Sequence, residues 1–257
     1  MDTGFDGQKL ALHPRRVGEW LETGRTSGPL YTEFELTSVC NHHCTFCGVD
    51  HLVNKTHVFM ERALALRIVD ELCALGNKSV MFAGHGESLL HPAAPDIIAR
   101  SSAQMSTSVT TNGSRLGPKR VHLIDGLEWI RFSVNGFGQD YQAVHATTAS
   151  MFETVIGHIE GAVERKHRMG LDVTIGTQIV LLPENVDGAL ALGTRLRDIG
   201  VDYFSVKPYS QHPESINRRE LDYTLMMPLR DELLALSEDD FQVSFRVGSM
   251  ERLGKEK

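Results

Sequence analysis

Three cysteines stand close together in the chain, at Cys40, Cys44 and Cys47, directly after an apolar and β-prone run. Cysteine thiolates are the ligands of iron–sulfur clusters and of many zinc sites in proteins. Three thiolates on one short loop can hold three corners of a cuboidal iron–sulfur cluster and leave its fourth iron open. A fully ligated cluster only carries electrons, whereas an open iron can bind a substrate or a cofactor. The spacing therefore predicts a reactive iron–sulfur centre.

Zinc is the alternative metal for this loop, because the same three thiolates with His42 or His43 make a tetrahedral donor set. A structural zinc site usually takes a second pair of ligands from a distant turn. The one remaining cysteine, Cys73, lies in an apolar helical pattern, which is typical of a small buried side chain. The loop by itself therefore favours an iron–sulfur cluster and leaves zinc open.

The composition of the 257 residues is that of an ordinary globular protein, with 41% hydrophobic and 23% charged residues. The net charge of −7 and the absence of a Lys/Arg-rich run exclude a protein that binds mainly to the nucleic-acid backbone. No apolar run reaches the length that a bilayer requires, so no membrane association is expected, and the acidic N-terminus shows no secretory signal. Clustered cysteines indicate a metal site in a reducing compartment, and we expect a cytoplasmic protein.

Strand and helix patterns alternate along the chain from Leu30 onward. The predicted strands are 30–39, 79–83, 106–110, 129–134, 173–182 and 201–206, and the predicted helices are 15–23, 61–75, 92–102, 119–124, 151–168, 185–199 and 228–236. Asn185 is predicted to cap the helix that starts there. Strands separated by helices pair in parallel through right-handed crossovers. Six such units are fewer than the eight of a closed barrel, so we predict an α/β fold with a partial (β/α)6 barrel.

The barrel is predicted to form a single core at 30–237. The N-terminal extension, 1–29, carries one short amphipathic helix and is too short to be a domain of its own. A C-terminal segment, 238–257, carries an alternating strand at 241–247 and a charged tail.

Polar residues and glycines recur where the predicted strands end. In parallel α/β folds the loops after the strands form the active face. The residues concerned are Gly84, Gly86 and Glu87 after the second strand, Asn112 after the third, Ser133 and Asn135 at the fourth, Gln178 in the fifth, and Lys207, Tyr209 and His212 at the sixth. Each has an ordinary explanation as a turn, strand-end or surface residue, and histidines such as His85, His91 and His212 are individually more often structural than catalytic. Their recurrence at one edge of the sheet predicts a single site.

These motifs resemble those of the radical S-adenosylmethionine (SAM) superfamily. The spacing Cys-x3-Cys-x2-Cys, with Phe46 before the last cysteine, is similar to the cluster signature of that superfamily. The sequence GHGESL at 84–89 resembles its glycine motif, with serine where proline is usual, and 111–113 and 133–136 stand where the family has similar motifs. The resemblance covers 31–236 and is strongest to the branch named SPASM or twitch. Members of that branch often continue into a cysteine-rich extension with auxiliary clusters.

The resemblance implies a [4Fe-4S] cluster held by Cys40, Cys44 and Cys47, with SAM chelating the open iron. It further implies reductive cleavage of SAM to a 5′-deoxyadenosyl radical, which abstracts a hydrogen atom from the substrate. The electron would come from a reductant such as flavodoxin or ferredoxin. The residues expected to bind SAM are Phe46, Gly84, Gly86, Glu87, Asn112, Ser133, Asn135, Gln178 and Val206.

The substrate side is less well defined by the sequence. Lys207, Tyr209 and His212 are hypothesised to contact a polar substrate, either anionic or hydroxylated, and Tyr209 is a candidate hydrogen-atom donor. Because residues 1–29 cannot form a peptide-recognition domain, a small metabolite such as a sugar, nucleoside or amino acid derivative is favoured over a peptide or protein substrate. A non-catalytic zinc or iron–sulfur module is the remote alternative. No cysteine follows Cys73, so either the protein lacks auxiliary clusters or the sequence ends before them.

Overall fold

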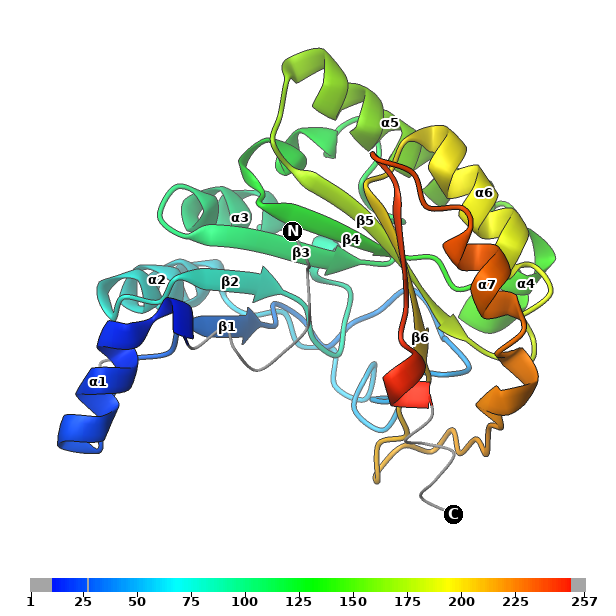
Figure 1. Ribbon diagram of the computed structural model, residues 1–257. Coiled ribbons are helices and arrows are strands. Elements are labelled where there is room, and N and C mark those ends of the chain that lie inside the picture. Colours follow the sequence, from blue (N-terminus) through cyan, green and yellow to red (C-terminus); the bar gives the residue numbers. More distant parts are fainter. Residues whose placement is uncertain (1–10, 27, 251–257) are drawn as a thin grey trace.

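The computed structural model describes residues 11–26 and 28–250. In this part of the chain, seven parallel strands form one sheet in the order β1-β2-β3-β4-β5-β6-β7 (Figure 1). The strands are β1 (Tyr31–Phe34), β2 (Ser79–Phe82), β3 (Ser106–Thr111), β4 (Trp129–Ser133), β5 (Thr174–Leu181), β6 (Tyr203–Pro208) and β7 (Gln242–Phe245). Because spatial order follows chain order, the sheet winds in one direction, as in a barrel and unlike a doubly wound sheet. β1 and β7 are not paired with each other, so the barrel is open. The predicted partial barrel is confirmed.

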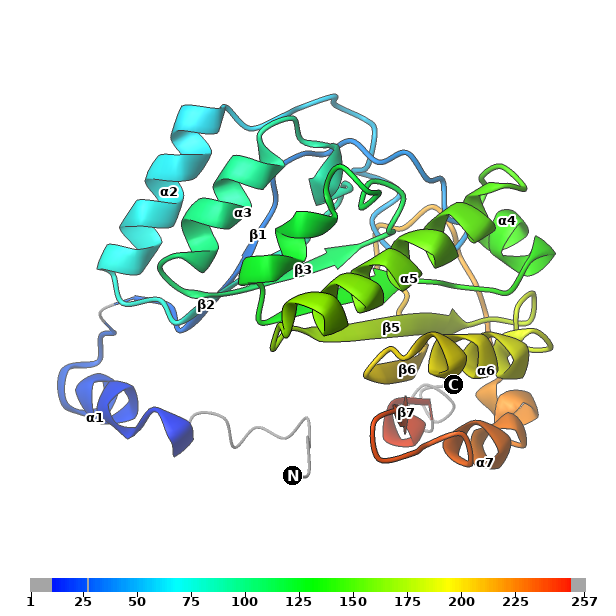
Figure 2. The ribbon, with the colours of Figure 1, turned by 90° about the horizontal axis from the view of Figure 1, so that it is seen from above.

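Helices cover one face of this sheet (Figure 2). They are α2 (Arg62–Ala74), α3 (Ala94–Ser102), α5 (Met151–Met169), α6 (Ala189–Ile199) and α7 (Leu229–Leu234), with the short helix α4 (Gln139–His145) and three 3-10 turns at Ser88–Leu90, Val121–Gly126 and Tyr223–Met226. The helix α1 (Pro14–Thr23) lies beyond the β1 side of the sheet, where Arg16 donates to the carbonyls of Leu75 and Gly76 after α2. None of the helices in the described residues is long and apolar enough to cross a membrane.

The hydrophobic core lies between the helices and the sheet, and this leaves the other face of each strand for polar residues. On β4, Ile130 and Phe132 are fully buried in the core. Since side chains alternate along a strand, Arg131 and Ser133 point to the opposite, inner face. The same alternation on the other strands gives the barrel its polar interior.

The structure corrects four details of the predicted elements. The strand at 241–247 pairs in parallel with β6, so the sheet has seven strands and not six. The strand predicted at 30–39 ends at Phe34, and the helix predicted at 119–124 is the 3-10 turn Val121–Gly126. The helix α4 was not predicted, because it is short and follows a glycine-rich turn. The division of the chain at 30 and 238 stays a prediction.

The predicted cap at Asn185 is wrong. The helix α6 begins at Ala189, and the residue at its cap position is Gly188. Asn185 is fully buried, and its side-chain oxygen accepts from the Leu182 N–H at 2.8 Å. Its amide nitrogen donates to the carbonyls of Val180 at 2.9 Å and of Asn135 at 3.2 Å. Asn185 therefore links the segment after β4 to the end of β5 through side-chain hydrogen bonds.

Candidate active site

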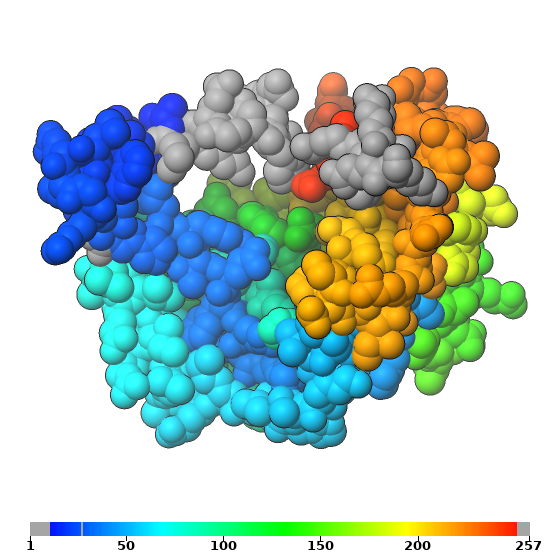
Figure 3. Space-filling model, turned by 90° about the horizontal axis from the view of Figure 1, so that it is seen from below, coloured from blue at the N-terminus to red at the C-terminus, as the bar shows by residue number. Residues whose placement is uncertain are grey.

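A cavity of about 810 Å³ lies on the inner face of the sheet towards the carboxyl ends of the strands. Figure 3 shows the molecule hollowed between the β1 side, in blue, and the chain after β6, in orange, with atoms of the middle of the chain, in green, at the bottom of the hollow. Sites for small molecules usually have volumes of about 300–1,000 Å³. The predicted site residues that line the cavity are Cys40, Cys44, Phe46, Cys47, Gly84, Gly86, Glu87, Asn112, Ser133, Asn135, Gln178, Lys207 and Tyr209.

Two predicted site residues do not line the cavity. Val206 is fully buried in the core on the helix side of β6, because its neighbour Lys207 faces the cavity and the two must point in opposite directions. Val180 of β5 provides apolar cavity surface in its place. His212 stacks on His51 with ring centroids 4.8 Å apart, and it belongs to the loop that follows β6. The expected contacts of Val206 with SAM and of His212 with the substrate stay predictions.

The cysteine loop is held by hydrogen bonds to its backbone. The side chain of Asn54 accepts from the Cys40 N–H at 2.9 Å and donates to the Cys40 carbonyl at 3.0 Å. The Cys47 N–H donates to the Cys44 carbonyl at 3.1 Å, which closes a turn between these two ligand candidates. The side-chain amide of Asn112 lies 4.0 Å from Cys40 Sγ. All three thiols are thereby presented from one ordered loop to one cavity.

Burial controls the charge of these thiols. It raises the pKa of Cys40 to about 11, and it also raises the pKa values of Cys44 and Cys47 above their ordinary range. Without a bound cation the thiols are therefore protonated at neutral pH. A metal ion reverses this preference, since its charge stabilises the thiolate that coordinates it. The environment suits metal-bound thiolates and disfavours a free nucleophilic cysteine.

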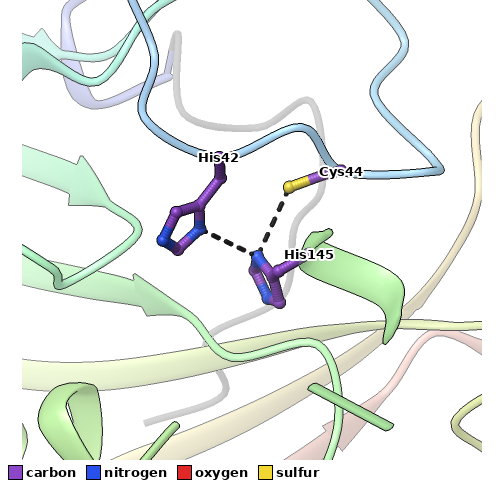
Figure 4. Close-up of side chains that lie close together, drawn as sticks. All are labelled: His42, Cys44 and His145. Carbon is purple, nitrogen blue, oxygen red and sulfur yellow. Dashed lines mark hydrogen bonds between the residues drawn. The ribbon is translucent and has the colours of Figure 1, made fainter. Parts of the chain in front are cut away.

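His145 of α4 reaches the cysteine loop, and no sequence pattern singles it out (Figure 4). Its ring is almost fully buried and stacks on Tyr141 at a centroid distance of 4.1 Å. The backbone N–H of Asn135 donates to His145 Nε2 at 3.0 Å. His145 Nδ1 lies 3.3 Å from Cys44 Sγ and 3.2 Å from His42 Nδ1. Burial lowers the pKa of His145 well below its ordinary value, so the ring is neutral.

The protonation of His145 decides between two kinds of metal site. The donor atoms of His42, Cys44 and His145 lie within 4.8 Å of one another, which is compatible with one metal ion. However, Nε2 of His145 accepts a hydrogen bond, so Nδ1 of the neutral ring carries the proton and cannot also be a ligand. The three cysteines do not form such a close group among the described residues. A cluster does not require one, because it spreads its thiolates over separate irons. The arrangement therefore fits a cluster better than zinc.

Two glycines allow the loop after β2 to pack against the segment between β1 and the cysteine loop. A Cβ at Gly86 would lie within 2.5 Å of the Val39 carbonyl oxygen and closer still to that of Thr37. Gly84 has φ of +146°, and a Cβ there would lie 2.7 Å from the side chain of Glu35. The close approach of two backbone segments thus requires glycine at both positions.

The buried carboxylate of Glu87 accepts three hydrogen bonds from neighbouring residues. Its carboxylate accepts from the Asn112 N–H at 2.7 Å, the Thr111 hydroxyl at 2.8 Å and the Leu89 N–H at 3.0 Å. Burial raises the pKa of Glu87, while these donors favour its ionised form. The carboxylate joins the loop after β2 to the end of β3. Its expected contact with the amino group of SAM stays a prediction.

The side-chain amides of Asn135 and Gln178 differ in whether the protein satisfies their oxygen atoms. The Oδ1 of Asn135 accepts from the Val180 N–H at 2.7 Å, so this side chain belongs to the scaffold. Gln178 donates through Nε2 to Ser133 at 2.9 Å, and its Oε1 is buried without a hydrogen-bond partner within the described part of the chain. A buried acceptor of this kind is normally satisfied by a ligand or by water. The cavity wall is thus suited to a ligand with hydroxyl or amine donors, such as SAM.

Tyr209 lines the cavity, but its hydroxyl donates to the Asn217 carbonyl at 2.8 Å. Its backbone N–H donates to the Tyr223 hydroxyl at 2.6 Å. These bonds hold Tyr209 within the loop after β6. Its predicted role as a hydrogen-atom donor stays a prediction.

The fold and the site together define a partial-barrel α/β protein with a candidate iron–sulfur centre at the carboxyl ends of its strands. The sequence model of the Radical SAM superfamily matches residues 34–192, more than half of the chain, and the chain therefore belongs to this superfamily. Membership implies a [4Fe-4S] cluster and SAM as cofactors, together with a reductant.

Two curated relatives are similar along most of the chain. A GTP 3′,8-cyclase of Chlorobaculum tepidum is 26% identical over 188 residues, which are 71% of this chain and 55% of that protein. The tungsten-containing aldehyde ferredoxin oxidoreductase cofactor-modifying protein of Pyrococcus furiosus is 25% identical over 223 residues, which are 83% of this chain and 61% of that protein. The chain thus spans less than two thirds of the length of either relative.

Solved structures share the fold. SuiB of Streptococcus suis bound to S-adenosylmethionine superposes with a TM-score of 0.71 at 16% identity, covering 96% of this chain and 57% of SuiB. Methylornithine synthase (PylB) superposes with a TM-score of 0.52 at 10% identity, covering 93% of this chain and 77% of that chain. At these identities the likeness shows the fold alone.

Proposed function

We propose that this protein cleaves SAM reductively at a [4Fe-4S] cluster held by Cys40, Cys44 and Cys47, and that it uses the resulting radical to abstract a hydrogen atom from a small-molecule substrate. The observation that carries the proposal is that the three thiols line the same cavity as the glycine loop after β2 and the unsatisfied amide of Gln178. When bound, the cluster supplies the electron that splits SAM into methionine and a 5′-deoxyadenosyl radical.

The residues of the chain would orient SAM and exclude water from it. Gly84 and Gly86 leave the backbone of the β2 loop open towards the cavity, and Gln178 Oε1 offers an acceptor for a ribose hydroxyl. Phe46 and Val180 provide apolar surface for the adenine ring. Because the cavity of about 810 Å³ would also hold the cluster and SAM, we propose a small metabolite as the second occupant. Flavodoxin or ferredoxin is proposed as the electron donor.

Anaerobic reconstitution with iron and sulfide tests this function. We expect a brown protein that releases 5′-deoxyadenosine from SAM in the presence of dithionite. Cys44→Ser should lose both the colour and the product, because a hydroxyl is a poor ligand for iron. Cys73→Ser is the matched control, since Cys73 packs against the core on α2 and does not line the cavity. A colourless, folded protein with stoichiometric zinc and no reaction with SAM would disprove the proposal.

His145 is expected to tune the potential of the cluster. Its Nδ1–H faces Cys44 Sγ at 3.3 Å, and N–H donors to cluster sulfurs stabilise the reduced state. His145→Phe should therefore make the midpoint potential more negative. A bond worth about 1 kcal/mol corresponds to roughly 40 mV for a one-electron couple. Redox titration followed by electron paramagnetic resonance measures the shift.

His43→Phe provides the control for this measurement. His43 is exposed and belongs to the same loop, whereas the ring of His145 is the one that lies 3.3 Å from Cys44 Sγ. Its replacement is expected to leave the midpoint potential unchanged. Equal potentials for His145→Phe and the unmodified protein would show that His145 only fills space beside Cys44.

A further inference from the structure

Three cationic side chains belong to the inner face of the sheet. Arg131 of β4 alternates with the core residues Ile130 and Phe132, and Lys207 of β6 alternates with the core residue Val206. Arg246 directly follows β7, and both Lys207 and Arg246 line the cavity that contains the cysteine loop. The strands β4 and β6 and the residue after β7 thus place positive charge on one side of the barrel.

The charge of Lys207 and Arg131 is not neutralised within the described protein. Lys207 forms no ion pair or hydrogen bond there, and the Nε of Arg131 is buried without a partner. One Nη of Arg131 donates to the Thr110 hydroxyl at 3.3 Å, and the Trp129 ring lies 5.2 Å from the guanidinium carbon. Both contacts are neutral. Half-buried cations without a counter-ion are costly, and a bound anion removes that cost.

The protonation of Lys207 reflects the same imbalance. Burial, together with the nearby charges of Arg131 and Arg246, lowers the pKa of Lys207 to about 8. Burial also lowers the pKa of Arg131, with Arg246 acting in the same direction and Tyr203, Tyr31 and Glu33 opposing it. Among the described residues, no carboxylate offsets these charges at Lys207.

Among the described residues, the acidic side chains Glu33, Glu35 and Glu87 belong to β1, to the segment after it and to the loop after β2, and all three are engaged by neighbours. Glu35 forms an ion pair with His85 at 2.8 Å. Glu33 accepts from the Tyr31 hydroxyl at 2.9 Å. The two sides of the cavity therefore differ in charge, and Lys207 on the positive side forms no ion pair or hydrogen bond within the described residues.

A glycine in β5 leaves room for the Tyr203 ring next to Arg131. Gly176 of β5 pairs with Arg131 on one side and with Tyr203 on the other. A Cβ at Gly176 would collide with the ring of Tyr203, so this ring lies across β5 towards Arg131. The guanidinium and the phenol thus lie deeper in the barrel than Ser133 and Gln178, which follow on the same strand faces.

We infer that the substrate carries an anionic group, a carboxylate or a phosphate, which binds between Arg131, Lys207 and Arg246 and holds the rest of the substrate in the cavity below the cysteine loop. This inference rests on the proposed function and names the substrate class of the same site. Arginine binds carboxylate and phosphate oxygens through two parallel N–H donors, and lysine adds a compact positive charge.

Binding of simple anions tests the inference without knowledge of the substrate. Inorganic phosphate and acetate are titrated into the reconstituted protein by isothermal calorimetry at low ionic strength, and the tighter of the two identifies the kind of group. Lys207→Gln and Arg131→Gln are each expected to weaken binding at least tenfold, whereas Lys207→Arg should retain it. Lys119→Gln is the control, because Lys119 is exposed and lies outside the cavity. Thermal melts establish that the variants are folded.

The pH dependence gives a second readout. The anion binds the protonated amine, and the pKa of Lys207 before binding is about 8. Affinity should therefore be full below pH 8 and fall above it in the unmodified protein, and this fall should be absent in Lys207→Gln. Equal affinities in all variants, or no binding of either anion, would overturn the inference.

Competition with SAM separates this site from the SAM site. Saturating SAM is expected to leave phosphate or acetate binding in place, since the two occupy different parts of the cavity. Displacement of the anion by SAM would assign the cations to SAM and overturn the inference. Failure of the proposed function looks different, because SAM would then yield no 5′-deoxyadenosine even though the anion still binds.

Discussion

Gly86→Ala is expected to destabilise the protein by about 3 kcal/mol, the upper end of the usual cost of overpacking. It is also expected to abolish cluster assembly. The added Cβ would lie within 2.5 Å of the Val39 carbonyl oxygen and 2.8 Å from the Val39 nitrogen, and closer still to the Thr37 oxygen. These are backbone atoms of the segment that leads into the cysteine loop. They cannot move aside as a side chain can, and the Val39 carbonyl also accepts from the Glu87 N–H at 2.9 Å. The substitution therefore separates the glycine loop from the cysteine loop.

Urea unfolding and the iron content per chain measure this effect. Gly157→Ala is the matched control, because Gly157 lies on α5 and a Cβ there meets nothing within 4 Å. Replacing an exposed glycine inside a helix by alanine should stabilise the protein by about 0.5–1 kcal/mol. The two substitutions add the same atom and are expected to have effects of opposite sign. A Gly86→Ala protein with normal iron content and stability would show that the two loops are not rigidly packed.

The strand order and the position of the site follow from local patterns, and so they could be predicted from the sequence. Alternation along β4 distinguishes the core residues Ile130 and Phe132 from Arg131 and Ser133, and the cysteine spacing marks the loop after β1. The same alternation places Val206 on the core side of β6 and Lys207 on the cavity side, so two neighbouring residues at a strand end do not share one face.

The contacts that the sequence did not predict join residues far apart in the chain. His145 meets His42 across 103 positions, and its helix α4 is too short to produce a clear periodic pattern. Arg131 is not part of a recognisable motif. Its place in a group of cations depends on Arg246, which the seventh strand brings near it. Such sites depend on which strand faces meet in space, and a single sequence does not contain that information.

Several residues expected to bind SAM are also part of the scaffold. Glu87 holds the end of β3 through its three hydrogen bonds, and Asn135 holds β5 through the Val180 N–H. A substitution at either position changes the shape of the cavity as well as any contact to a ligand. Loss of activity in such variants therefore requires a stability measurement before it is attributed to SAM binding.

Asn185→Ala is expected to destabilise the protein by about 3 kcal/mol, although Asn185 does not line the cavity. Its side chain satisfies the Leu182 N–H and the carbonyls of Val180 and Asn135, and its position is fully buried. Alanine leaves these three backbone groups without a partner and without access to water, at a cost of about 1 kcal/mol or more each. Because Asn135 supports His145 and the cavity wall, SAM affinity should fall in parallel.

The conservative substitution sharpens this prediction. Asn185→Asp keeps an acceptor for the Leu182 N–H but turns a carboxylate oxygen towards the carbonyls of Val180 and Asn135, so it should be no more stable than Asn185→Ala. Asp187→Ala is the control, since Asp187 is exposed in the same segment and is expected to change stability by less than about 0.5 kcal/mol. Urea unfolding of the three variants decides the matter. A stable Asn185→Asp protein would mean that a single acceptor is sufficient and that β4 and β5 do not depend on this amide to stay together.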